Sequence, residues 1–179
     1  MTEPQPQRKF DQPPFQLYNP GAVGNSKGIC IYGRGGVGKT STLLTMRGIG
    51  LVLDVPSVEG GTEVLTGAKN IKISTIKDWD ELESRYLYLQ AGNHPFVWCA
   101  IDSATGLEVL AKHKVVKERP AGLSADPHTI SLQEYGKIGD LMNELVFKFR
   151  RLDIHTVWIA QERNHKIGGE EVVGPGVLP

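Results

Sequence analysis

The sequence predicts an α/β domain with a mostly parallel sheet covered by helices on both faces. Short apolar runs typical of buried strands alternate with segments of helical periodicity, a glycine-rich loop follows the first run, and a carboxylate ends another. The chain has 179 residues, enough for one such domain with a substantial core but too few for two. We therefore expect one domain over residues 25–179, preceded by a Pro- and Gln-rich lead-in, residues 1–24, that is disordered or extended.

The glycine-rich loop fits the phosphate-binding pattern G-x-x-x-x-G-K-[ST] at every fixed position, in the order Gly33-Arg34-Gly35-Gly36-Val37-Gly38-Lys39-Thr40. Residues 29–32 before it indicate a buried strand, and residues 41–46 after it can open a short helix. Positive φ angles at Gly33, Gly36 and Gly38 would let the loop curl and point its N–H groups at a phosphate. Lys39 is expected to contact the β- and γ-phosphates and Thr40 to ligate Mg²⁺, and Ser41 completes the predicted nucleotide site.

The remaining patterns place strands at residues 51–54, 70–74, 96–102 and 154–160. Helices are expected near residues 79–89, 103–117 and 131–151, and a flexible loop or unfinished end over residues 164–179. Cys30 and Cys99 lie in apolar runs, where free cysteines serve as small buried hydrophobic residues.

Three polar residues near strand ends are candidates for catalysis. Asp102 ends the apolar run 96–102, and on a strand adjacent to that of the phosphate loop it can hold the hydration shell of Mg²⁺. Glu59, beyond the second strand, is the best-placed group to orient or deprotonate an attacking water, although a solvated turn residue is the alternative. Gln161 ends the last strand and can contact the γ-phosphate, passing its presence to the loop behind it.

Charge and hydropathy limit the partners. Lys plus Arg and Asp plus Glu number 20 each, so net charge gives no sign of nucleic-acid binding, and any such surface must be local. No apolar run is long enough to span a bilayer, and the start of the chain does not have the pattern of a signal peptide. We therefore expect a cytoplasmic protein.

The pattern resembles the RecA-like ATPases of bacteriophages over roughly residues 26–170. The resemblance rests on the phosphate loop, Glu59-Gly60-Gly61, Asp102-Ser103, Gln133-Glu134-Tyr135-Gly136 and residues 158–163. It implies a RecA-like three-layer fold, ATP and Mg²⁺ as cofactors, and a role in phage DNA recombination or single-strand annealing in the host cytoplasm. Asp102 would be the Walker B carboxylate, Glu59 the catalytic glutamate and Gln161 the nucleotide sensor.

The same resemblance implies that the loop from Arg163 onward binds single-stranded DNA, in a protein that can form a homo-oligomer. Its few basic residues are offset by Glu170 and Glu171, so no phosphate-tracking groove follows from the sequence. Proteins of this family continue with further strands where this chain stops, so the domain is expected to be truncated at its C-terminus or to have an incomplete sheet.

Two other classes stay open. The phosphate loop of ParA/MinD-type ATPases begins Lys-Gly-Gly, but here Arg34 stands where that lysine would reach across a dimer, and a planar guanidinium does not reproduce its contacts. The other alternative is a nucleotide-binding scaffold or a small-molecule kinase, for which no acceptor-binding motif is present.

Overall fold

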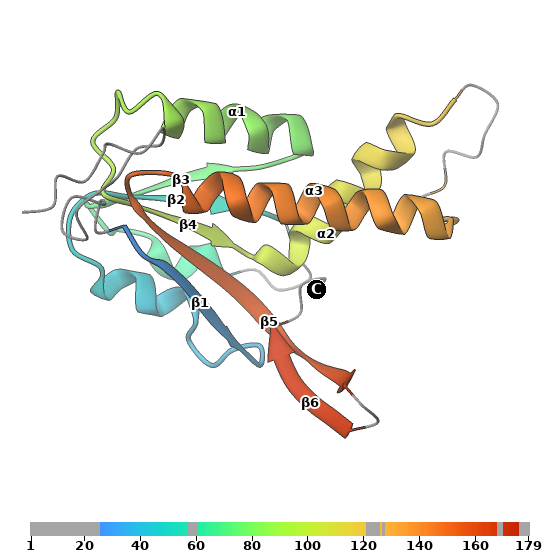
Figure 1. Cartoon of the computed structure of the whole chain (residues 1–179). Helices are drawn as coiled ribbons and strands as arrows, with labels where there is room; N and C mark the ends of the chain where they lie inside the picture. Colours follow the sequence, from blue (N-terminus) through green and yellow to red (C-terminus); the bar gives the residue numbers. More distant parts are fainter. Residues whose placement is uncertain (1–25, 57–60, 121–125, 127, 168–169, 176–179) are drawn as a thin grey trace, which may run out of the picture.

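The structure is a computed structural model that describes residues 26–56, 61–120, 126, 128–167 and 170–175. Its strands are β1 (Gly28–Gly33), β2 (Gly50–Asp54), β3 (Ile71–Thr75), β4 (Trp98–Asp102), β5 (His155–Ile167) and β6 (Glu170–Pro175). Its helices are α1 (Trp79–Gln90), α2 (Ala104–Lys117) and α3 (Leu132–Arg150), with two short 3-10 helices, η1 (Thr40–Thr45) and η2 (Thr62–Leu65). Figure 1 shows their arrangement.

The sheet is mostly parallel, which confirms the predicted fold class. Its strands lie in the order β1-β5-β4-β2-β3, and all four pairings in this order are parallel. The carboxyl ends of parallel strands share one edge of the sheet, and ligands of open α/β sheets bind there. Gly33 is in register with Gln161, and Asp102 with Asp54.

One detail of the topology differs from the sequence prediction. Asp102 was expected on a strand adjacent to that of the phosphate loop, but β5 lies between β1 and β4. The physical reason is that strand order is set by crossover connections between distant segments, which local apolar patterns do not encode. As a consequence, Gln161 at the main-sheet end of β5 lies between the phosphate loop and Asp102.

Two apolar clusters pack on the two faces of the sheet, and they differ in size. The larger one joins buried residues of α1, α2 and α3 to β2, β4 and β5, and it contains the predicted helix positions Trp79, Leu82, Tyr86 and Leu89. The smaller one joins η1 and η2 to the opposite face. Flanking helices on both faces are thus confirmed, although one face carries only short 3-10 turns.

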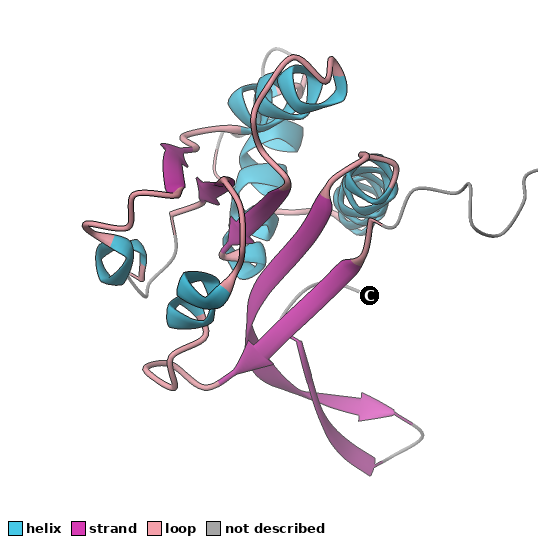
Figure 2. Cartoon of the chain, turned by 90° about the vertical axis from the view of Figure 1, so that its left-hand side faces the viewer, coloured by secondary structure: helices cyan, strands magenta, loops and turns pink. Residues whose placement is uncertain are grey.

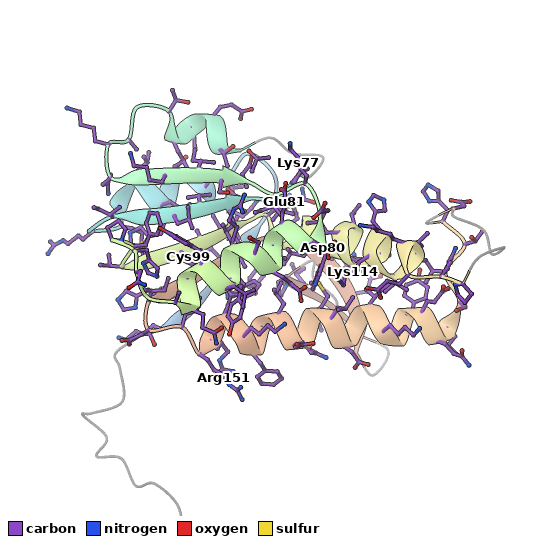
Figure 3. All side chains as sticks on the ribbon, turned by 90° about the horizontal axis from the view of Figure 1, so that it is seen from above. Lys77, Asp80, Glu81, Cys99, Lys114 and Arg151 are labelled. Carbon is purple, nitrogen blue, oxygen red and sulfur yellow. The ribbon has the colours of Figure 1, made fainter. Side chains whose placement is uncertain are left out.

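Caps and ion pairs fix the ends of the α-helices. The Asp78 carboxylate accepts from Glu81 N–H at the start of α1, and Ser131 and Glu134 form a capping box at the start of α3. Lys114 of α2 donates to Asp80 of α1 over 3.0 Å, and Figure 3 shows the two side chains facing each other. None of the helices in the described part of the chain is long and apolar enough to cross a membrane.

The first strand is less buried than predicted. Cys99 is buried as expected, but Cys30 is exposed, and most residues of β1 are exposed as well. The reason is position in the sheet: among the described strands of the main sheet β1 pairs only with β5, so it lies at the edge. An apolar run does not reveal which strand of a sheet will be at the edge.

The last segment also differs from the prediction of a flexible loop. β5 continues to Ile167 and β6 pairs with it antiparallel, from Glu162 opposite Pro175 to Ile167 opposite Glu170. Figures 1 and 2 show this two-stranded ribbon leaving the body of the molecule. Because it projects from the main sheet, its residues need not be apolar, so the polar sequence 161–166 did not indicate a strand.

Candidate functional site

A cavity of about 180 Å³ opens beyond the carboxyl ends of β1 and β4, beside Ile159 and Gln161 of β5. The described residues that line it are Gly36, Gly38, Lys39, Thr40, Ser41, Gly61, Val64, Asp102, Ser103, Ile159 and Gln161. Seven of these were sequence-predicted site residues, from the phosphate loop and two strand ends. The other predicted loop residues, Gly33, Arg34, Gly35 and Val37, belong to the same loop but are not among the lining residues.

The loop reaches its curled shape through two glycines. Gly36 has φ 74° and Gly38 has φ 89°, in the left-handed region that residues with a Cβ rarely adopt. Gly33 does not have a positive φ, so the predicted conformational role of this glycine is wrong. It is still the last residue of β1 and pairs with β5.

The Lys39 ammonium lies against the backbone of the first two residues of the phosphate loop. Its Nζ donates to the carbonyl oxygens of Gly33 over 3.0 Å and of Arg34 over 2.7 Å. These acceptors are neutral, so an anion in the cavity would compete with them for the charge of the ammonium. The geometry therefore holds a cation beside the cavity with bonds that can be exchanged.

Thr40 and Asp102 meet across the cavity. The Thr40 hydroxyl donates to Asp102 Oδ2 over 2.6 Å, joining the start of η1 to the end of β4. A hydroxyl and a carboxylate are oxygen ligands of the kind that Mg²⁺ takes in proteins, where it binds one or two carboxylates together with substrate phosphates and water. The described residues include no cluster of three or more His, Cys, Asp or Glu side chains that could hold a metal by itself.

The environment of Asp102 disfavours its charged form. Burial raises the pKa of this carboxyl, and the nearby Asp54 carboxylate raises it further, while the Thr40 hydrogen bond and the Lys39 charge oppose the shift. Asp102 is only 8% exposed. Because burial and the Asp54 charge both disfavour the charged form of Asp102, a cation bound beside this carboxylate would stabilise it strongly.

Gly61 allows the loop after β2 to approach this pair. A Cβ at Gly61 would lie 3.0 Å from Thr40 Oγ1 and 3.8 Å from Asp102 Oδ2. Its φ of −161° is extended backbone that any residue can adopt, so close approach and not conformation favours glycine here. The candidate base Glu59 lies outside the described residues, only two positions before Gly61.

Gln161 is held at the rim of the cavity by its backbone. Its N–H donates to Thr105 Oγ1 over 3.0 Å, in the first turn of α2, and its Cα is in register with Gly33. Gln161 thus lies between the phosphate loop and the carboxyl end of β4, and it lines the cavity.

Sequence reasoning missed three residues at the site. Ser103 is 7% exposed, and its Oγ has no hydrogen-bond partner among the described residues, although the residue lines the cavity. Gly61 gave no signal beyond a Gly-Gly pair. Asp54 could have been found, because it is a carboxylate at the end of an apolar strand, as Asp102 is.

The chain matches none of the curated proteins. Residues 25–175 match a protein family that is described as an AAA domain, a match that includes every residue of the cavity described above. This range covers most of the chain and agrees with the phosphate loop and the parallel sheet. The chain therefore belongs to this AAA domain family of P-loop ATPases.

Proposed function

We propose that this protein binds ATP with Mg²⁺ in the cavity at the end of β1 and hydrolyses it. The observation that carries the proposal is the 2.6 Å contact between Thr40 and Asp102, beside the Lys39 ammonium and a loop curled at two glycines. These groups come from segments more than 60 positions apart and converge on one cavity. A glycine-rich turn that matched the motif by chance would not need this convergence.

Each group has a role that follows from its charge. The Lys39 ammonium would exchange its bonds to two carbonyls for bonds to the β- and γ-phosphates. Thr40 and Asp102 would hold the cation through the hydroxyl oxygen and through the carboxylate with its hydration shell. The bound Mg²⁺ would neutralise charge that develops on the phosphate oxygens. The N–H groups of the curled loop would contribute fixed partial positive charge.

Hydrolysis also needs a group that takes a proton from water. We assign this to Glu59: as water adds to the γ-phosphorus and the bond to the ADP oxygen breaks, the water proton passes to the Glu59 carboxylate. Support comes from Gly61, whose backbone lies close to Thr40 and Asp102. Gly61 lines the cavity and follows Glu59 by two residues, which span at most about 7 Å of chain.

Gln161 is assigned the role of nucleotide sensor. It lines the cavity, and the strand that carries it continues without a break into the hairpin with β6. A change in its contacts on loss of the γ-phosphate would therefore act on the root of that hairpin.

We further propose that the activity serves recombination or annealing of single-stranded DNA, as in the RecA-like proteins of phages. The hairpin offers a surface next to the sensor, and Arg163 on it is exposed, although it also pairs with Glu108 over 3.4 Å. Assembly into a homo-oligomer belongs to the same proposal. Size-exclusion chromatography with and without nucleotide and DNA measures it.

The ATPase proposal is tested by phosphate release. Lys39→Ala and Asp102→Ala should abolish turnover, while Glu59→Gln should bind ATP without hydrolysing it. Lys72→Ala, which removes an exposed lysine of β3, is the matched control and should retain full turnover. Turnover at the wild-type rate in Lys39→Ala would refute the assignment, and the same result in Glu59→Gln would remove only that residue.

The DNA proposal needs its own assay. At low salt, single-stranded DNA should accelerate ATP turnover, and the double variant Arg163→Ala/Lys166→Ala should lose the acceleration while keeping basal turnover. Absence of both binding and acceleration in the wild-type protein would end the recombination proposal and favour a nucleotide-binding scaffold or a kinase.

A further inference from the structure

An ion pair links the phosphate loop to the strand that carries the sensor. Arg34 Nε donates to Glu162 Oε1 over 2.9 Å, which joins the second residue of the loop to the residue after Gln161. The Arg34 side chain is 83% exposed and that of Glu162 is 29% exposed. The contact therefore lies at the surface, outside the cavity but between the two elements that form its walls.

On the loop side, the same arginine is held by the phosphate-binding lysine. Lys39 Nζ donates to the backbone oxygen of Arg34 over 2.7 Å. If the ammonium turns to a phosphate, this carbonyl loses its charged donor, and the backbone at Arg34 is free to shift. A shift there moves the guanidinium at the other end of the residue, and with it the partner carboxylate of Glu162.

On the strand side, three successive residues of β5 make three different attachments. Gln161 N–H donates to Thr105 of α2, Glu162 accepts from Arg34, and Arg163 donates to Glu108 of α2 over 3.4 Å. Glu162 is also the first residue of the ladder with β6, opposite Pro175. The ion pair between Arg34 and Glu162 thus lies where the hairpin leaves the main sheet. The attachments of Gln161 and Arg163 at the same place are both to α2.

We propose that Glu162 is a positioning residue that couples phosphate occupancy of the loop to the β5–β6 hairpin through Arg34. This rests on the proposed ATP binding and adds to it a second link, independent of the contact between the Gln161 side chain and the γ-phosphate. An exposed ion pair is weak, so the link adjusts the hairpin and does not lock it. Its loss should reduce the response of the hairpin about threefold and should not abolish ATP binding.

The test is hydrogen–deuterium exchange of the full chain with and without Mg²⁺ and a non-hydrolysable ATP analogue. In the wild-type protein, the analogue should slow exchange in the phosphate loop and change it in residues 161–175. In Glu162→Gln, the loop should still be protected while the change in the hairpin falls about threefold.

Asp80→Asn is the matched control, because it breaks exposed ion pairs between α1 and α2, 3.0 Å to Lys114 and 3.5 Å to Lys117, away from the cavity. It should respond to the analogue as the wild-type protein does. Protection of neither segment in the wild-type protein would overturn ATP binding and this inference together. A protected loop with an unchanged hairpin, or equal hairpin responses in the wild-type and Glu162→Gln proteins, would overturn the inference alone, as would a reduced response in Asp80→Asn.

Discussion

Replacement of Thr40 by valine tests the central contact of the site without changing the volume of the side chain. The Thr40 hydroxyl donates to Asp102, whose residue is 8% exposed, so water has little access to replace the lost donor. A hydrogen bond to an ionised carboxylate contributes about 1.5–3 kcal/mol, and we take about 2 kcal/mol here. For a chain of this size that loss lowers Tm by about 4–8 °C.

Thermal unfolding followed by circular dichroism, without nucleotide, measures this loss, and ATP turnover is measured on the same samples. Thr40→Ser keeps the hydroxyl and is the control, with a much smaller change in Tm and retained turnover. The sign of the pH dependence is also fixed. The hydrogen bond lowers the pKa of Asp102, so the deficit of Thr40→Val is present when that carboxyl is ionised and shrinks as pH falls and it protonates. A Tm of Thr40→Val within 1 °C of wild type near neutral pH would refute the reasoning.

Two further predictions concern the loop after β2 and the start of α3. Gly61→Ala places a methyl group 3.0 Å from Thr40 Oγ1, so ATP turnover should fall about tenfold with little change in Tm. Gly136→Ala is the control and should leave turnover intact, because its new Cβ has no neighbour within 4 Å. The Arg119 guanidinium, with help from the helix cap, lowers the pKa of Glu134 from 4.5 to about 2. Stability from this pair is therefore present above pH 4.5 and lost as pH falls toward 2, and Glu134→Gln should lack that part of the acid transition in unfolding curves recorded from pH 5 to pH 2.

The sequence was informative where a local pattern has one physical solution. A loop that must curl around a phosphate needs glycine at Gly36 and Gly38 and a cation at Lys39, and the structure gives those positions the expected shape. Helix positions were equally clear, because the apolar residues of α1 and α3 recur at helical spacing and their caps have typical residues.

What the sequence did not reveal depends on neighbours that are distant along the chain. The apolar run around Cys30 looks like that around Cys99, but only the second lies in a strand with partners on both sides. The approach of Gly61 to Thr40 and Asp102 joins three separate segments, and a single glycine in a turn does not predict such a contact. The roles of Glu59 and Gln161 stay predictions, to be decided by the variants above.

The length of β5 allows a small rotation within the main sheet to become a larger displacement at the tip of the hairpin. β5 is unbroken from His155 to Ile167, with its first part paired on both sides with β1 and β4 and its remainder paired, among the described strands, with β6 alone. The six residues beyond Gln161 extend about 20 Å at the usual rise of a strand. A tilt of about 5° at this point would move the far end by about 2 Å, although the rim of the cavity itself hardly moves.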